Sequence, residues 1–354
     1  MEYVEALLRD LEQDLPAVWG RRVQTIFIGG GTPSLFTPDA LEALLTGVRT
    51  RIPVSPEAEI TLEANPGTVE TDRFRGFRQA GVNRLSIGVQ SFDDAKLVAL
   101  GRIHDGAAAA RAADAAHAAG FSNFNLDLMY ALPGQTVAQA QSDLAAAIAL
   151  RPTHLSIYQL TLEPNTLFHR APPALPDDDT AFEMQQRLHA QAADAGYVQY
   201  EVSAYAQAGA RCRHNLNYWQ FGDYLGIGAG AHGKLTDHTG IVRTAKARQP
   251  RDYLAKAGTA AGREVERRLS AADAAFEFML NALRLNGGFS LDLFCARTGL
   301  AAAALEPALS QAQARHWLVR DGDAIRTTEL GARFLNDVLQ NFLPPGDTGT
   351  AHVT

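Results

Sequence analysis

The stretch TIFIGGGTPS, residues 25–34, decides the fold of this 354-residue chain. Four residues with high strand propensity are followed by three glycines, which allow a tight turn, and by Pro33, which cannot continue a strand. A helical pattern then runs from Pro38 to Arg49. The stretch therefore predicts a buried strand, a glycine turn and a helix, which is the first half of a βαβ unit.

The same alternation is repeated along the chain. Strands are predicted at residues 25–28, 59–62, 84–89, 124–128, 154–158 and 197–205, and helices at 38–49, 71–80, 106–119, 137–150 and 180–195. Strands that alternate with helices at intervals of 25 to 45 residues indicate parallel pairing. The sequence thus predicts an α/β protein.

Polar or glycine residues stand where each predicted strand ends. They are residues 29–32 (GGGT), Glu63, Gln90, Asp127, Gln159 and Glu201. In a (β/α) barrel these positions meet at one mouth, although polarity also rises wherever a strand finishes. A doubly wound sheet with a dinucleotide loop is the alternative, but IGGGTPSLFTPD lacks the G-x-G-x-x-G spacing. We therefore favour the barrel.

The chain opens with an amphipathic helix that has no strand before it, so we expect an incomplete (β/α) barrel whose first strand is missing. The predicted domains are this barrel at residues 1–235, a connector at 236–269, an accessory domain at 270–343 and a tail at 344–354. Residues 224–233 (YLGIGAGAHG) are read as a buried strand. The accessory domain, with three helices, a hairpin turning at Gly322 and a last helix, resembles a winged helix.

Composition limits the partners and the compartment. Asp and Glu number 39 against 32 Lys and Arg, for a net charge of −7, which argues against nucleic acid. A basic signal peptide is not seen at the N-terminus, and the sequence has no apolar run long enough for a membrane span. The two cysteines, Cys212 and Cys295, fit no metal or redox spacing. These features predict a cytoplasmic protein.

Several strand-end residues are suited to a polar ligand. Backbone N–H groups at Gly30 and Gly31 can approach a ligand closely, although a tight turn would use the same glycines. The carboxylate of Glu63 suits a ribose diol or an ammonium group, and Arg102 suits a carboxylate. Gln90 and Asp127 occupy the same layer, and an idle buried carboxylate at Asp127 would be too costly to keep.

A second cluster, HNLNYW at residues 214–219, combines one histidine with flat aromatic side chains. His214 can be an axial iron ligand, while Tyr218 and Trp219 offer surface for a porphyrin. A buried histidine that holds a loop beside core aromatics is the alternative interpretation.

The motifs GGGTPS, EANPG, SIGVQS, LGRIH and DLMYALPGQT resemble, in this order and spacing, the radical S-adenosylmethionine (SAM) barrel of the oxygen-independent coproporphyrinogen III oxidase family. The match is closer to its HemW-type haem-chaperone branch and runs from about Gln24 to Leu343. The resemblance implies that SAM is held by Gly30, Gly31, Thr32, Glu63, Gln90, Arg102 and Asp127.

The resemblance also implies a function. H-N-x-x-Y-W is associated with haem binding in the HemW-type branch, whereas the oxidases tend to carry Arg in place of His214. It therefore implies a haem chaperone that delivers haem to an acceptor protein, with haem contacts at His214, Tyr218 and Trp219. The alternative is the oxidase itself, which decarboxylates coproporphyrinogen III by a SAM-derived radical.

The cluster motif of the family is the main departure. Radical SAM proteins hold a [4Fe–4S] cluster by C-x3-C-x2-C, which is not present in this sequence, and Cys212 and Cys295 cannot replace it. No metal-ligating residues are therefore predicted, and we lean away from an enzyme. We expect that this sequence lacks the N-terminal segment of a longer, complete protein. The alternative is a paralogue that has lost its cluster.

Overall fold

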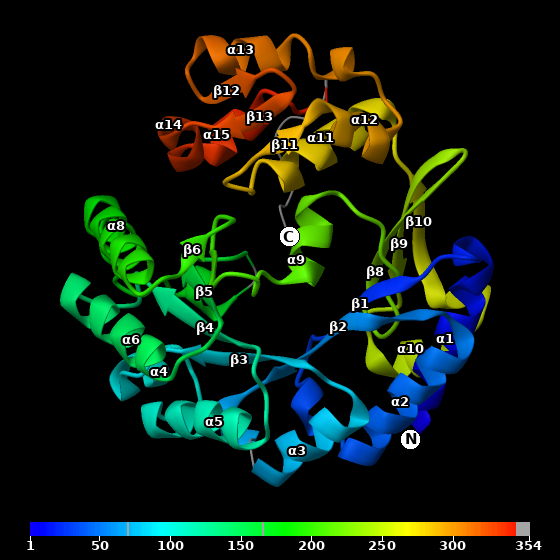
Figure 1. Ribbon diagram of the computed structural model, residues 1–354, viewed down its shortest axis with the longest axis horizontal. Coiled ribbons are helices and arrows are strands. Elements are labelled where there is room, and N and C mark those ends of the chain that lie inside the picture. Colours follow the sequence, from blue (N-terminus) through cyan, green and yellow to red (C-terminus); the bar gives the residue numbers. More distant parts are fainter. Residues whose placement is uncertain (69–70, 165, 345–354) are drawn as a thin grey trace. The chain divides into compact units, whose positions relative to one another are not determined.

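A computed structural model describes residues 1–68, 71–164 and 166–344, which form two compact units (Figure 1). The sheet unit comprises residues 22–46 and 54–213, and the accessory unit comprises residues 1–21, 47–53 and those from 214 onward. The domain boundaries expected from the sequence stay predictions, and the expected tail lies almost wholly outside the described residues.

The sheet unit alternates strands and helices as predicted. Its elements are β1 (Val23–Ile28), α2 (Pro38–Arg51, which continues into the accessory unit), β2 (Val54–Ala64), α3 (Thr71–Ala80), β3 (Arg84–Gln90), α4 (Asp94–Ala99), α5 (Gly106–Ala118), β4 (Phe124–Tyr130), α6 (Val137–Ala149), β5 (His154–Gln159), α7 (Leu167–Arg170), α8 (Asp178–Asp194), β6 (Val198–Gln199) and β7 (Ala204–Ala206).

One seven-stranded sheet organises this unit, with strand order β1-β2-β3-β4-β5-β7-β6. The strands from β1 to β5 are parallel neighbours in chain order, with Glu63 opposite Ser86 and Asp127 opposite Ser156. The predicted α/β class with a mostly parallel sheet is therefore confirmed. Because parallel strands end at one edge, their terminal side chains share one region.

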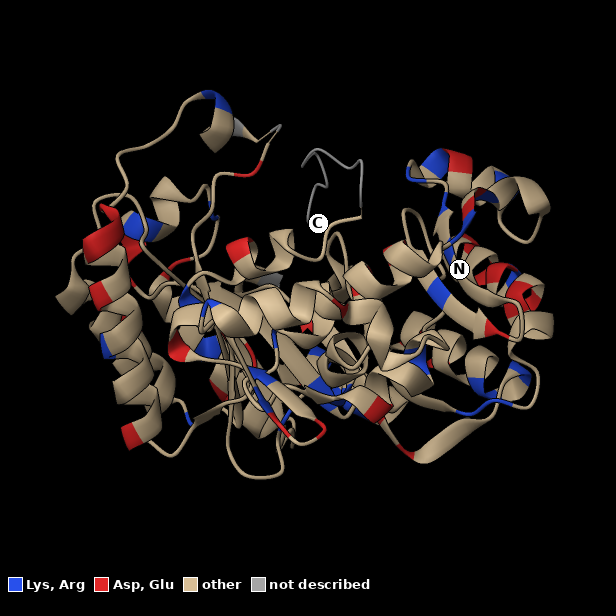
Figure 2. Ribbon diagram, turned by 90° about the horizontal axis from the view of Figure 1, so that it is seen from above, with Lys and Arg blue, Asp and Glu red and all other residues tan. Residues whose placement is uncertain are grey.

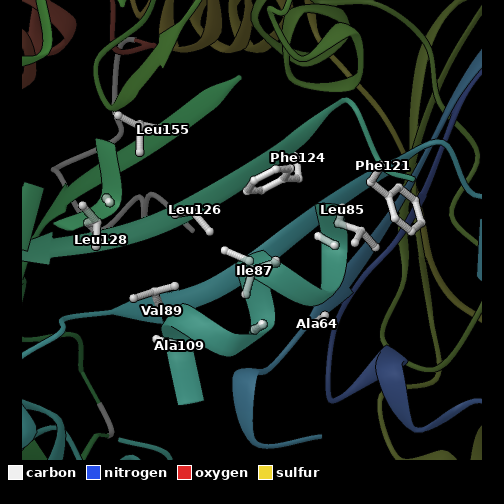
Figure 3. Close-up of a cluster of buried hydrophobic side chains, with 14 of the residues drawn as sticks. Ala64, Leu85, Ile87, Val89, Ala109, Phe121, Phe124, Leu126, Leu128 and Leu155 are labelled. Atoms are coloured by element: carbon white, nitrogen blue, oxygen red, sulfur yellow. The ribbon is translucent and has the colours of Figure 1, made fainter. Parts of the chain in front are cut away.

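The outer face of the sheet carries the hydrophobic core. On β3, Leu85, Ile87 and Val89 are fully buried and lie beside Leu126 and Leu128 of β4 (Figure 3). Helices α3, α5, α6 and α8 supply the other side of this core. Because side chains alternate across a strand, the apolar positions on this face leave the intervening positions to the inner face.

Residues 197–205 do not form the single strand that the sequence predicts. The segment makes two short strands, β6 and β7, which pair with each other antiparallel, and β7 pairs antiparallel with β5. A bend at Glu201 to Ser203, where the Ser203 amide donates to the Glu201 carboxylate, reverses the chain. The aromatic-rich run thus supplied a hairpin instead of one more parallel strand.

The accessory unit contains helices and two small antiparallel sheets. Its elements are α1 (Glu2–Asp14), α9 (Arg213–Trp219, of which Arg213 belongs to the sheet unit), β8 (His232–Asp237), β9 (Gly240–Lys246), α10 (Pro250–Lys256), β10 (Arg263–Arg268), α11 (Ala271–Ala282), β11 (Phe289–Ser290), α12 (Leu291–Thr298), α13 (Ala308–Ala314), β12 (Leu318–Asp321), β13 (Ala324–Thr327), α14 (Glu329–Arg333) and α15 (Leu335–Gln340). The sheet orders are β10-β9-β8 and β11-β13-β12.

Two expectations fail in this unit. Residues 224–233 are mostly loop, because Gly228 and Gly230 have φ of 115° and 70°, which a strand does not allow. The supposed connector at 236–269 contains most of the β8–β9–β10 sheet. Its strands carry many charged residues, a composition that strand propensity disfavours, so the sequence pattern missed them.

The C-terminal part has the expected winged-helix-like order. Helices α11, α12 and α13 precede a β12–β13 hairpin that turns at Gly322, and β11 joins it as a third strand. Phe278 of α11 is fully buried and contacts Phe289 and Phe294 edge-on, which places the core of this part around α11.

Acidic and basic residues are interspersed along both units (Figure 2). No helix within the described ranges is both long and apolar enough to cross a bilayer. The opening helix α1 packs by Val4, Leu7 and Leu11, as its amphipathic pattern predicts.

Candidate functional site

The inner face of the seven-stranded sheet is polar. On β3 the positions between the core residues are Arg84, Ser86 and Gln90, and on β4 they include Asn125 and Asp127. Four of these side chains are buried and that of Asp127 is half-buried; the buried ones are Arg84, Ser86, Gln90 and Asn125. A sheet face that buries this many polar groups is built for a polar ligand or for a hydrogen-bond network.

Asn125 is the centre of such a network. Its amide nitrogen donates to the Ser86 hydroxyl (2.9 Å) and the Asp127 carboxylate (2.8 Å). Its amide oxygen accepts from the Ser156 hydroxyl (3.0 Å) and lies 2.7 Å from Nδ1 of His154. One amide therefore fixes side chains from three neighbouring strands.

His154 extends the network to Tyr200, which lies between β6 and β7. Its Nε2 lies 2.9 Å from the hydroxyl of Tyr200. Burial, together with the nearby Arg84 cation, lowers the pKa of His154 well below its usual value, so the ring is neutral at pH 7. Because Asn125 offers its oxygen, the network assigns the proton to Nδ1, and Nε2 accepts from the Tyr200 hydroxyl.

Two polar atoms on this face are buried without a hydrogen-bond partner in the described part of the chain. They are Nε of Arg84, whose side chain is 2% exposed, and Oγ1 of Thr61, which lies opposite Arg84 in the β2–β3 register. Leaving such groups unpaired costs about 1–3 kcal/mol each. The inner face is therefore not optimised for stability alone.

The predicted residues Glu63 and Asp127 lie close enough for their charges to interact. Burial raises the pKa of Glu63, the hydrogen bond from the Gly30 amide opposes this, and the Asp127 charge raises it further. Burial also raises the pKa of Asp127, against the lowering effects of Asn125, Ser156, Arg84 and Ser86. Two carboxylates whose charges disfavour each other attract a cation or a multiple hydrogen-bond donor.

The glycine turn after β1 lies beside the Glu63 carboxylate. The Gly30 amide donates to the Glu63 carboxylate (3.0 Å), and a Cβ at Gly29 would lie 3.0 Å from that carboxylate and 2.6 Å from the Phe27 ring. Gly30 and Gly31 have positive φ of 84° and 35°, and Thr32 is the N-cap of the short 3-10 helix Pro33–Leu35 that follows. The absence of side chains here lets the backbone approach Glu63 and exposes N–H groups beside it.

Gln90 adopts a left-handed backbone at the end of β3, with φ of 70°. Its amide nitrogen folds back to 3.1 Å from the position that a Cβ of Gly88 would occupy. A strained non-glycine residue is kept where function or packing demands a particular direction. Gln90 thus belongs to the same strand-end layer as Glu63.

Arg102 is not joined to these residues. It lies exposed in the loop after α4, and none of the described residues makes a hydrogen bond or ion pair with its side chain. Its neighbour Ile103 is 96% exposed. The sheet unit therefore brings Gly30, Glu63 and Asp127 together, places Gln90 at the end of β3 and leaves Arg102 in an exposed loop.

The other predicted residues lie on α9 in the accessory unit. His214 and Tyr218 are four residues apart, and their rings meet edge-on at 4.9 Å, as expected for one helix face. Tyr218 in turn contacts Tyr224 edge-on at 4.5 Å. Burial, with the nearby Tyr224, raises the pKa of Tyr218 to about 12, so it stays a neutral hydroxyl.

Neither cysteine forms a metal centre with its neighbours. Cys212 is buried with its thiol 3.5 Å from the Glu59 carboxylate, and Cys295 lies on α12 in the other unit. The described residues contain no group of three or more His, Cys, Asp or Glu that could hold a metal. The residues present therefore do not fit a [4Fe–4S] cluster, which needs three thiolates.

The sequence analysis missed the supporting residues of the inner face: Arg84, Ser86, Asn125, His154, Ser156 and Tyr200. The signal was available, because RLSIGVQ and FNLDL alternate polar and apolar residues with a period of two. These residues were not predicted because they lie within the strands, whereas the prediction of a site rested on the strand ends.

Two family models match the chain. The radical SAM superfamily model covers residues 2–146, and the HemN C-terminal domain model covers residues 269–334. The first includes every residue that the sequence analysis predicts to hold SAM, and the second includes most of the winged-helix-like part.

Curated relatives match over nearly the whole chain. Proteins named "Heme chaperone HemW" from Escherichia coli, Haemophilus influenzae and Bacillus subtilis are 51%, 46% and 32% identical, over 97% of this chain and 90 to 91% of theirs. Among solved structures, E. coli coproporphyrinogen III oxidase HemN, a radical SAM enzyme, matches with a TM-score of 0.79 at 22% identity, over 96% of this chain and 82% of that one. That likeness is one of fold.

Proposed function

Because the chain belongs to the HemW family of haem chaperones, we propose that it binds haem and delivers it to an acceptor protein. The observation that carries the proposal is the placement of His214 on α9, half-buried and with its ring set edge-on against Tyr218. An imidazole oriented by an aromatic neighbour is suited to an axial contact with haem iron. Tyr218 and Trp219 are the proposed flanking contacts.

A haemin titration tests this proposal. The full chain should show a Soret shift that His214→Ala weakens by about tenfold or more, because the iron loses its axial ligand. His238→Ala is the matched control, since His238 is an exposed histidine of the same unit. Equal binding by the wild type and His214→Ala would contradict the assignment.

We also propose that SAM binds at the carboxyl ends of the sheet strands. The donor set fits its chemistry: the Glu63 and Asp127 carboxylates suit its ammonium and ribose hydroxyl groups, the Gly30 N–H orients the Glu63 carboxylate, and the glycine backbone at Gly31 allows a close approach of the ligand. Thr32, Gln90 and Arg102 complete the proposed set. When bound, SAM supplies a sulfonium group.

Binding of S-adenosylhomocysteine, measured by calorimetry, tests the SAM site without requiring any turnover. Asp127→Asn should weaken it about tenfold, because a charge-assisted hydrogen bond is lost. Asp114→Asn on the exposed face of α5 is the control and should bind like the wild type. An unchanged affinity in Asp127→Asn would remove Asp127 from the proposed set.

We assign no radical step to these residues, because they do not fit a [4Fe–4S] cluster. The chain is therefore proposed as a haem carrier on a radical SAM scaffold. Its two free cysteines support a reducing compartment, and we propose the cytoplasm.

A further inference from the structure

Arg84, the first residue of β3, is a buried cation without a direct partner. Leu85 and Ile87 belong to the hydrophobic core, so the alternating positions of Arg84 and Ser86 belong to the inner face (Figure 3). Only 2% of Arg84 is exposed, and its guanidinium makes no hydrogen bond or ion pair within the described ranges of the chain. A buried charge without a partner is costly to keep, which points to a partner that a ligand supplies.

Two other arginines also enclose their Nε without a partner, but their terminal nitrogens are engaged. Nη2 of Arg73 donates to the Phe36 carbonyl (3.0 Å), and Arg263 pairs with two carboxylates. Nε and Nη2 form one edge of a guanidinium, on which a carboxylate can accept two parallel hydrogen bonds. That edge is partly occupied in Arg73, whereas it is open in Arg84.

Thr61 of β2 supplies a second donor beside this edge. It lies opposite Arg84 in the parallel register, so the two side chains stand on the same face of neighbouring strands, which are about 4.8 Å apart. Thr61 is fully buried, and its hydroxyl has no hydrogen-bond partner in the described part of the chain. The buried guanidinium and the buried hydroxyl therefore both have room for the same acceptor.

Two carboxylates on this face are already engaged by neutral donors. Glu59 of β2 accepts from the Arg213 backbone amide (3.1 Å). Asp127 of β4 accepts from the amide of Asn125 (2.8 Å) and the hydroxyl of Ser86 (3.3 Å). Neither carboxylate lies within ion-pair distance of the buried guanidinium, so an anionic acceptor from outside the chain suits this position.

We propose that Arg84 and Thr61 bind the carboxylate of a small ligand other than SAM on the inner face of the sheet. The guanidinium edge donates two hydrogen bonds and the hydroxyl donates a third, which satisfies every unpaired donor at this position. Thr61 precedes Glu63 by two residues, roughly 7 Å along β2, and Arg84 precedes Gln90 by six, roughly 20 Å along β3. The site is therefore separate from the strand-end residues proposed for SAM, and it depends on neither the haem nor the SAM proposal.

A titration with formate, the smallest carboxylate, tests this assignment on the full chain carrying 15N-labelled arginine. The Nε–H signal of Arg84, identified by its loss in Arg84→Lys, should shift with formate until it saturates, because the carboxylate accepts from that group. Formamide has the same shape without the charge and should cause less than about a tenth of the shift. The Nε–H of Arg73 is the internal control and should not respond, because its edge is partly occupied.

Thr61→Val separates binding from a structural role. Valine keeps the shape of the side chain and removes a hydroxyl that has no partner in the described part of the chain, so the variant should unfold thermally at a midpoint no lower than that of the wild type. Formate should nevertheless bind it about tenfold more weakly, because one hydrogen bond to a charged group is lost. A structural hydroxyl would give the reverse: a lower midpoint and unchanged formate affinity.

Three results would overturn the proposal: an Arg84 signal that formate does not shift, an equal response to formamide, or an unchanged formate affinity in Thr61→Val. If Arg84→Lys fails to fold, the perturbation of the same signal in Thr61→Val identifies it. The formate shift should persist at saturating S-adenosylhomocysteine. If S-adenosylhomocysteine abolished it, the bound carboxylate would be its own and the assignment to another ligand would fall. If S-adenosylhomocysteine does not bind, the SAM proposal fails and the formate result stands alone.

Discussion

Both units bury charged groups, but they treat them differently. In the accessory unit, Lys246 of β9 is 3% exposed and binds Asp10 and Asp14 of α1, and Asp14 also binds Arg263. In the sheet unit, Arg84 is equally buried, yet its Nε has no partner among the described residues. One buried cation is saturated by carboxylates, and the other is not.

The difference separates a structural cluster from a binding surface. The hydroxyl of Tyr253 adds a further hydrogen bond to Asp10, so the cluster around Lys246 has little left to offer a ligand. The inner face of the sheet instead carries Glu63 and Asp127, whose pKa values are raised by burial. Perturbed carboxylates beside unpaired donors are typical of functional sites.

Removing Lys246 should produce the largest effect. Lys246→Ala leaves Asp10 and Asp14 buried with one cation fewer, and breaking a buried pair in this way typically costs about 3–5 kcal/mol. We expect the free energy of unfolding, measured in urea, to fall by that amount. Binding of S-adenosylhomocysteine by the molecules that remain folded should be unchanged.

Lys256→Ala is the matched control, because Lys256 pairs with Glu264 at 3.7 Å on the surface of the same unit. Exposed pairs contribute about 0–1 kcal/mol. If both lysine variants lost the same small amount, the cluster around Lys246 would not be the structural element that its pairing indicates.

The sequence predicted the strand-end layer of the sheet unit but not the buried cluster around Lys246. The layer of Glu63, Gln90 and Asp127 was foreseen because parallel strands bring their ends together, and that geometry follows from the strand order alone. The pairing of Lys246 with α1 was not foreseen, because it joins residues more than 230 positions apart through a sheet that the pattern had read as a connector. Long-range partners of this kind leave no local signal.

The supporting residues of α9 were hidden for the same reason. His214, Tyr218 and Trp219 are contiguous, so a motif could reveal them. Arg284 follows 65 positions after Trp219 and is an ordinary arginine at the end of an alanine-rich helix. Only the folded arrangement brings it over the indole ring.

Acidification should weaken S-adenosylhomocysteine binding by the sheet unit. The pKa of Glu63 is raised above its ordinary value of 4.5, so the carboxylate gains a proton at a higher pH than a free one, while the ligand's ammonium group keeps its charge. Affinity should therefore be highest above the raised pKa and fall about tenfold per unit of pH below it. Calorimetry between pH 7 and 4.5 measures this.

Glu63→Gln supplies the control for that profile. Its affinity should be low at pH 7 and should depend on pH less steeply than that of the wild type, because only Asp127, whose pKa is also raised, remains to be protonated in this site. A variant that kept the wild-type slope would show that another group controls the profile and would weaken the contrast drawn between the two units.

Two helix caps provide a control for the comparison, because α6 in the sheet unit and α11 in the accessory unit each begin with a capping box. The side chains of Thr136 and Ser270 accept from the backbone N–H of the third helical residue, and the backbone N–H of each cap donates to the side chain of that residue. Thr136→Ala and Ser270→Ala should each lower the free energy of unfolding by about 1 kcal/mol. A cap loss several times larger in one unit would mean that the units respond differently to any change, and not to charge pairing in particular.

The smallest predicted effect is a gain in stability, in Asp127→Asn. Because the folded state raises the pKa of Asp127, it binds a proton more tightly than the unfolded chain does, and stability falls as the pH rises from the unfolded pKa through the folded one. Above the raised pKa, the ionised Asp127 therefore opposes folding. Asp127→Asn removes that charge, while the Ser86 hydroxyl, 3.3 Å away, can accept as well as donate. Thermal unfolding at pH 7 should show a slightly higher midpoint for Asp127→Asn than for the wild type, and the difference should vanish toward pH 4. A lower midpoint would place Asp127 with Lys246 among the residues kept for stability, and the contrast between the two buried clusters would be lost.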